Sequence, residues 1–222
     1  TIKIPDDGKC DACKTANKKN KIDWEKREHE LIKLLDKHRK SGGEYDCIVP
    51  GSGGKDSAMQ AHILKYKYGM NPLTITWSPL MYTDYGYQNW KNWIDIGGFD
   101  NMLFTRNGDV MRRLTKLSIE NLFHPFQTFI LGQKNFAPKI AEKLNIPLVF
   151  YGENEAEYGN PLADNNTSLR DKSFNTFKNL DNIYLAGLKI KELTDKHNIK
   201  KTDLLPFLPS IPNTKTKTDI KI

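Results

Sequence analysis

A run of small and charged residues, Gly51-Ser52-Gly53-Gly54-Lys55-Asp56-Ser57, is well suited to bind a phosphate. Neighbouring glycines let backbone N–H groups turn toward an anion, and the N-terminus of a following helix adds partial positive charge. Ser52 and Ser57 can donate hydroxyl hydrogen bonds, and Lys55 supplies a full charge. Asp56 does not favour a phosphate unaided, so we expect it to contact Mg²⁺ or to cap the helix. The alternative is an ordinary glycine-rich turn, and the spacing fits neither a Walker loop nor a dinucleotide-binding loop.

A second polar group follows the apolar run 146–151, which we interpret as a buried strand. The acidic segment 153–157 would therefore lie at the carboxyl edge of a sheet, where open α/β sheets bind ligands. Carboxylates there could hold Mg²⁺ or polarise ammonia. An exposed acidic loop is the alternative, but several acids near a phosphate site require a cation, which favours a functional interpretation.

Residues that end the second predicted strand are candidate nucleotide contacts. Trp77 and Tyr82 could stack on adenine or on a uridine-type base, although aromatics in this position are nearly as often part of a core. Thr76 and Ser78 could hydrogen-bond the nucleotide, and Gly132, ahead of a predicted helix, could approach it.

The three cysteines do not form a disulfide scaffold, and their small number suits a reducing cytosol. Cys10 and Cys13 have the spacing of one zinc knuckle, which is half of a tetrahedral structural site. A redox pair is the alternative, but it would normally open a helix in a thioredoxin-like unit, which the sequence does not indicate. Cys47 lies inside the first predicted strand, where we expect a buried thiol.

Short apolar runs that alternate with helical patterns must position these groups, and they predict an α/β fold with a Rossmann-like, doubly wound parallel sheet. The predicted strands are 45–50, 73–77, 101–105 and 146–151. The predicted helices are 23–40, 57–68, 88–96, 110–122, 136–144, 188–197 and 202–208. We expect a cysteine segment (1–22), a linking helix (23–44), a nucleotide-binding domain (45–160), and a mobile loop with a short helical C-terminal part (161–222).

The composition limits the classes of function. No apolar stretch is long enough to cross a membrane, and no leader opens the chain, so we expect a cytoplasmic protein without a membrane partner. The net charge of +7 lies at the two ends: residues 1–44 hold 12 basic and 9 acidic groups, residues 188–222 hold 8 and 4, and the middle holds 14 of each. A neutral middle makes nucleic acid an unlikely partner, and we interpret the basic ends as solvated lysine faces.

The segment Ser52 to Ser57 resembles the PP-loop, Ser-Gly-Gly-x-Asp-Ser, of the ATP pyrophosphatase superfamily over all six residues. The resemblance implies a PP-loop domain over 45–160 that cleaves ATP between its α- and β-phosphates. Such enzymes adenylate a carbonyl-type oxygen, and a nitrogen or sulfur nucleophile then displaces AMP. The loop would stabilise the departing pyrophosphate by electrostatic preorganisation.

Further segments are similar to the N-acetyl sugar amidotransferase family, over roughly residues 45–160. The segments that carry this similarity are Thr76-Trp77-Ser78-Pro79, Thr83-Asp84-Tyr85-Gly86 with Asn89, Gly98-Phe99-Asp100, Asn107-Gly108 and Tyr151-Gly152-Glu153-Asn154-Glu155-Ala156-Glu157-Tyr158-Gly159. The resemblance implies an ATP-dependent ligase that adenylates the N-acetyl group of a nucleotide-linked sugar and replaces its oxygen with nitrogen from ammonia. The product would be an acetamidino sugar for surface polysaccharides such as O-antigen. A glutaminase subunit of the histidine-biosynthesis type, with its cyclase-like companion, would supply the ammonia.

The resemblance and the loop together give a set of predicted site residues. The predicted catalytic residues are Lys55, Asp56, Glu153 and Glu157. The predicted ATP contacts are Gly51, Ser52, Gly53, Gly54, Lys55, Asp56, Ser57, Thr76, Trp77, Ser78, Gly132, Gly152 and Asn154. The predicted metal ligands are Cys10 and Cys13 for a structural zinc and Asp56 for magnesium, so the expected cofactors are ATP, Mg²⁺ and Zn²⁺.

Two departures from the family pattern keep other interpretations open. The family has a second Cys-x-x-Cys upstream of the stretch seen here at Pro5 to Gly8, and that segment is absent; the tail after Pro212 also differs. A tRNA-modifying sulfurtransferase of the same superfamily is the main alternative, because some of those enzymes pair cysteine knuckles with a PP-loop. A nucleotide-binding module that only docks a partner is a third.

Overall fold

Asp23 begins the long helix of the N-terminal unit in the computed structural model, which describes residues 6–152 and 183–209. Its side chain accepts a hydrogen bond from the backbone N of Lys26 at 3.0 Å, and the helix α2 (Trp24–His38) lies within the predicted 23–40. A shorter helix, α1 (Asp11–Lys19), precedes it and was not expected from the sequence. These helices belong to one compact unit, Thr1–Arg39, and the second unit is Lys40–Ile222.

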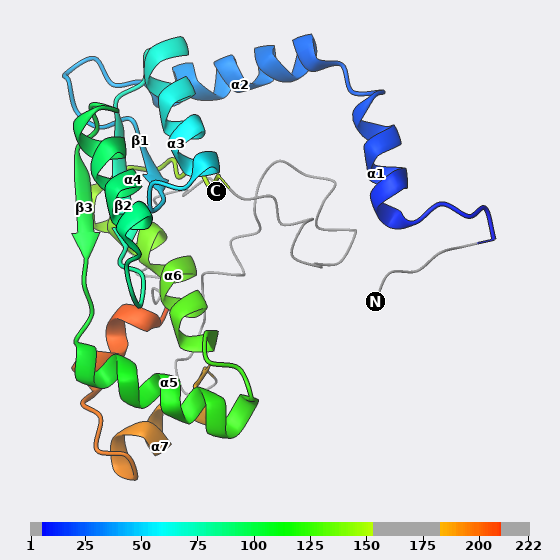
Figure 1. Cartoon of the computed structure of the whole chain (residues 1–222). Helices are drawn as coiled ribbons and strands as arrows, with labels where there is room; N and C mark the ends of the chain where they lie inside the picture. The colour runs from blue at the N-terminus through cyan, green and yellow to red at the C-terminus, as the bar shows by residue number, and fades with distance from the viewer. Residues whose placement is uncertain (1–5, 153–182, 210–222) are drawn as a thin grey trace. The chain divides into compact units, whose positions relative to one another are not determined.

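Three parallel strands form the sheet of the second unit, in the order β1 (Cys47–Pro50), β2 (Pro72–Trp77) and β3 (Asn101–Phe104) (Figure 1). The run predicted as a fourth strand contributes one parallel bridge, between Ile48 and Val149. The Ile48 backbone N donates to the Leu148 carbonyl at 2.9 Å, and the Ile48 carbonyl accepts from the Phe150 backbone N at 2.8 Å. The run therefore lies on the side of β1 away from β2. The order is therefore fourth run, β1, β2, β3.

Helices cover both faces of this sheet. Along β2, Leu73, Ile75 and Trp77 point to one face and Thr74 and Thr76 to the other, because side chains alternate along a strand. The first face packs against α6 (Gln127–Leu144), and the second against α4 (Asp84–Asp95), with α3 (Lys55–His62) lying against β1. A parallel α/β sheet with helices on both faces is compatible with the predicted Rossmann-like fold.

Several predicted helices begin earlier than the sequence indicated, and capping residues explain the starts of α4 and α5. The Thr83 hydroxyl accepts from the Gly86 backbone N at 3.0 Å, which starts α4 four residues before 88. Asn107 caps α5 (Gly108–Leu122) in the same way. α6 begins nine residues before 136 and contains a buried proline, Pro138. The predicted 57–68 is divided into α3 and a π-helical turn, Ile63–Lys67.

The described C-terminal residues form part of the same hydrophobic core. A hairpin of β4 (Tyr184–Leu185) and β5 (Leu188–Lys189) precedes α7 (Ile190–Asp195), α8 (Lys201–Leu204) and a 3₁₀ turn, Leu205–Phe207. Buried side chains from these elements pack in one cluster with those of β2, α5 and α6: Ile183, Leu185, Ile190, Leu193, Ile199, Leu204, Phe207 and Leu208. Among the helices that the structure describes, none has the length and apolar character to cross a membrane.

Candidate phosphate-binding site

The loop from Gly51 to Ser57 joins the carboxyl end of β1 to α3, as the sequence predicts. Gly53 has φ +83°, and a Cβ placed there would lie 2.7 Å from the backbone N and Cα of Trp90 on α4. Both the left-handed backbone and this close approach require glycine. The loop is therefore fixed against the middle of α4.

Gly54 differs from Gly53, because the fold does not require a glycine there. Its φ of −66° suits any residue, and a Cβ would meet no atom within 4 Å. It is the N-cap of α3, and no side chain caps this helix end. A glycine with open space in front of it exposes the backbone at the positive end of a helix, which is the geometry that an anion needs.

Lys55 and Asp56 form an exposed ion pair in the first turn of α3. The Lys55 Nζ lies 2.8 Å from a carboxylate oxygen of Asp56, and the two side chains are 88% and 65% exposed. Asp56 lies inside the helix, so the expectation that it might cap the helix is wrong: the cap is Gly54. Because both side chains are exposed, a ligand can reach both charges. Exposed ion pairs contribute little to stability, so a ligand can replace this one at low cost.

The end of the fourth run lies directly against this loop. A Cβ on Gly152 would be 2.9 Å from the backbone N of Ser57, and the Gln60 side-chain amide donates to the Tyr151 carbonyl at 2.9 Å. Because β1 has β2 on one side and the fourth run on the other, the loop lies at the topological switch point, where open α/β sheets bind ligands. Glu153, Asn154 and Glu157, predicted in the next segment, lie outside the described residues.

The residues that end β2 are buried; the hydroxyls of Thr76 and Ser78 have partners within the fold, whereas the buried Trp77 Nε1 has none among the described residues. Thr76 has no exposed surface, and its hydroxyl accepts from Trp90 Nε1 at 3.2 Å and from Asn101 Nδ2 at 3.0 Å. Trp77 is 6% exposed, with ring centroids 5.3 and 5.4 Å from those of Phe104 and Phe136. The predicted stacking of Trp77 on a base is corrected here: its ring is part of the core.

Gly132 is explained by the same packing. A Cβ at this position in α6 would lie 2.0 Å from Cζ2 of Trp77, so the glycine makes room for the indole. The expectation that Gly132 approaches the nucleotide is therefore replaced by a packing role. Ser78 is 5% exposed, and its hydroxyl donates to the Pro79 carbonyl at 3.2 Å.

Arg106, which the sequence analysis missed, holds the chain that follows β2. Its guanidinium donates to the carbonyl of Ser78 and, at 3.3 Å, to that of Pro79, and it lies 4.8 Å above the ring of Trp77. Burial lowers the pKa of Arg106 to about 10. Its position directly after the third predicted strand was the feature of the sequence that could have identified it.

The cysteine pair lies at the start of α1 in the N-terminal unit. The Sγ atoms of Cys10 and Cys13 lie 3.5 Å apart, and the hydrogen bond between the two thiols raises the pKa of Cys13. Two sulfur ligands of one tetrahedral zinc are about 3.8 Å apart, since Zn–S bonds are about 2.3 Å long, so the pair fits half of such a site. Within residues 6–152 and 183–209, no group of three or more His, Cys, Asp or Glu could hold a metal.

Cys47 is fully buried at the start of β1, and desolvation raises its pKa to about 12. This confirms the predicted buried thiol. A thiol held neutral in a core is a poor nucleophile.

No family model matches the chain. A stretch of 52 residues is 42% identical to an uncharacterised protein of Methanocaldococcus jannaschii, and this match covers 23% of the chain and 19% of that protein. The match thus spans about a fifth of the relative's length.

Proposed function

We propose that the chain is the synthetase subunit of an AMP-forming, ATP-dependent N-acetyl sugar amidotransferase with a PP-loop domain. The observation that carries this proposal is the loop Ser52–Ser57, which lies at the switch point of a parallel sheet and presents an exposed, side-chain-free backbone at Gly54. An ordinary turn would explain Gly53, and glycine is also common at helix N-caps, but the open space at Gly54 leaves the start of α3 accessible to an anion.

The chemistry of the loop suits the release of pyrophosphate. Backbone N–H groups at the start of α3 and the Lys55 ammonium would stabilise the negative charge that builds on the β- and γ-phosphates as the bond to the α-phosphorus breaks. Asp56 offers one carboxylate, and Mg²⁺ in nucleotide sites is commonly held by one or two carboxylates together with phosphate oxygens. Breaking the exposed Lys55–Asp56 pair to do this costs little.

The proposed reaction has two steps, adenylation of the sugar and displacement of AMP by ammonia. The acetamido oxygen of the sugar attacks the α-phosphorus of ATP, and pyrophosphate leaves. Ammonia then attacks the activated carbon, and AMP departs with the oxygen, giving the acetamidino group. Glu153 and Glu157 are the proposed groups to orient or deprotonate the ammonia, since their segment follows Gly152, which lies against the loop.

The remaining components of the proposal rest on the sequence resemblance. A glutaminase of the histidine-biosynthesis type and its cyclase-like companion would supply ammonia, and Cys10 and Cys13 would be two ligands of a structural zinc. The cytoplasm is the proposed location, because nucleotide sugars and reduced thiols are found there.

The test is release of AMP and pyrophosphate from Mg·ATP with excess ammonium and a panel of nucleotide-linked N-acetyl sugars. We expect release that requires one sugar class and is lost in Lys55→Ala. Release that requires tRNA and a sulfur donor would favour the sulfurtransferase instead, although the buried Cys47 offers no nucleophile to that reaction. ADP and phosphate as products would overturn the proposal.

A further inference from the structure

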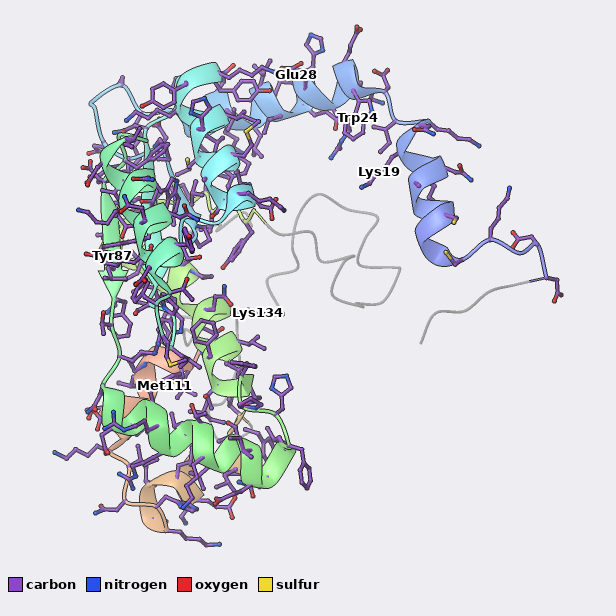
Figure 2. The ribbon with its side chains drawn as sticks, viewed as in Figure 1. Lys19, Trp24, Glu28, Tyr87, Met111 and Lys134 are labelled. Carbon is purple, nitrogen blue, oxygen red and sulfur yellow. The ribbon has the colours of Figure 1, made fainter. Side chains whose placement is uncertain are left out.

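One side chain of α3 joins this helix to the end of the fourth run. The Gln60 Nε2 donates to the Tyr151 carbonyl at 2.9 Å, across 91 positions of the chain. The Tyr151 hydroxyl in turn donates to the carbonyl of Lys134 at 3.2 Å, and Lys134 lies on α6 (Figure 2). Tyr151 is therefore held through its backbone by α3 and through its side chain by α6.

The position of Tyr151 determines where the next residue lies. A Cβ on Gly152 would be 2.9 Å from the backbone N of Ser57 and 3.0 Å from the carbonyl carbon of Asp56. These are backbone atoms of the first turn of α3, where amide groups have no carbonyl partner within the helix. Gly152 therefore borders the candidate phosphate site, and a shift of Tyr151 would move this border.

Stability alone does not explain the amide of Gln60. Because Nε2 faces the Tyr151 carbonyl, Oε1 must point elsewhere, and this atom is buried without a hydrogen-bond partner among residues 6–152 and 183–209. An unsatisfied buried acceptor costs at least as much as one neutral hydrogen bond contributes. An apolar side chain of the same length would therefore stabilise the fold equally well, but it could not hold the Tyr151 carbonyl.

We infer that Gln60 is a positioning residue for the proposed reaction. Through the Tyr151 carbonyl, it keeps Gly152 against the first turn of α3. It thereby fixes, relative to the phosphate loop, the point from which the acidic segment 153–157 continues. The inference rests on the proposed function, which assigns the ammonia step to two carboxylates of that segment.

The test compares two glutamine variants of the full chain. Gln60→Met keeps the length of the side chain and removes its amide. Gln127→Met is the matched control, because the Gln127 Nε2 also donates to a distant backbone carbonyl, that of Tyr184, at 3.3 Å. Urea unfolding, calorimetric titration with inorganic pyrophosphate, and AMP formation at varied ammonium concentration are measured for wild type and both variants.

We expect Gln60→Met to lower kcat for AMP formation by about 10- to 100-fold, because catalysis is sensitive to displacements on the order of 1 Å. Pyrophosphate affinity should stay unchanged, since the loop backbone and Lys55 are intact. Gln127→Met should keep its kcat at a similar shift of the urea midpoint. A wild-type kcat in Gln60→Met, or an equal loss in both variants, would overturn the inference.

A second measurement separates the inference from the proposed function. The Phe150 backbone N donates to the Ile48 carbonyl at 2.8 Å, so its hydrogen–deuterium exchange reports how firmly the end of the fourth run is held. We expect faster exchange at Phe150 in Gln60→Met than in wild type or Gln127→Met, even if no sugar supports AMP formation and the proposed function fails. Equal exchange in all three proteins would overturn the inference. Loss of AMP formation in Lys55→Ala but not in Gln60→Met would also overturn it and would leave the proposed function standing.

Discussion

The loop Gly51–Ser57 and the residues Thr76–Ser78 lie at the carboxyl ends of β1 and β2, which are adjacent parallel strands. The sequence predicted nucleotide contacts in both segments. The structure treats them differently. Gly54 and the Lys55–Asp56 pair are exposed, whereas Thr76, Trp77 and Ser78 are buried. A polar or aromatic residue at a sheet edge is therefore a candidate ligand contact only when the fold leaves its side chain or backbone exposed.

Removing the indole of Trp77 should have the largest effect on stability if this residue belongs to the core. We expect Trp77→Ala to lower the free energy of unfolding by about 3–5 kcal/mol, because the ring fills the core between Phe104, Phe136 and Gly132. Urea unfolding followed by far-UV circular dichroism measures this. A variant that keeps its stability but loses ATP binding would return Trp77 to the ligand site.

Removing the Lys55 side chain should lower activity and leave stability almost unchanged. We expect Lys55→Ala to reduce AMP formation roughly 100- to 1000-fold, as for other groups that stabilise developing charge. The side chain is 88% exposed, so the midpoint of urea unfolding should hardly move. Lys116→Ala is a matched lysine control for activity, because Lys116 is 76% exposed and also pairs with a carboxylate, that of Glu120. Equal loss of activity in both variants would contradict a specific role for Lys55.

Neighbouring glycines provide a comparison within the loop itself. Gly53→Ala should cost about 1–3 kcal/mol of stability, since its positive φ and the Trp90 backbone both oppose a side chain. Gly54→Ala should change stability by less than about 1 kcal/mol but should weaken Mg·ATP binding, because the methyl group would stand where the phosphate approaches. Thermal unfolding and calorimetric titration of the two proteins measure both effects. Unchanged ATP affinity in Gly54→Ala would favour the simple turn.

An effect confined to high pH concerns the buried start of β1, four residues before Gly51. Burial raises the pKa of Cys47 from its ordinary 9.0 to about 12, so the folded state holds this proton more tightly than the unfolded state. The stabilisation is complete below pH 9 and falls as pH rises toward 12, by about 1.4 kcal/mol for each pH unit. Comparing urea unfolding of wild type and Cys47→Ala at pH 8 and pH 10.5 cancels the other titrating groups. Parallel losses in the two proteins would mean that the thiol is solvated.

The alternation of apolar runs and helical patterns determined much of this architecture. Apolar periodicity is a local property, so it located β1, β2 and β3 within two residues, and the glycines of the loop marked the turn between β1 and α3. Starts of α4 and α6 were less accurate, because a cap such as Thr83 or the tolerance for Pro138 depends on contacts that periodicity does not contain.

Only the tertiary structure decided which candidate residues are accessible. Residue type and spacing are the same for a buried and an exposed aromatic, so the sequence could not separate Trp77 from Tyr85. Packing made the distinction: α6 covers the face of β2 that carries Trp77, and Gly132 admits its ring. The strand order likewise brought Gly152 against Ser57, two residues far apart in the chain. The sequence thus determined the residues of the candidate phosphate-binding loop, and the fold determined which candidate side chains stay exposed, because burial arises from long-range packing.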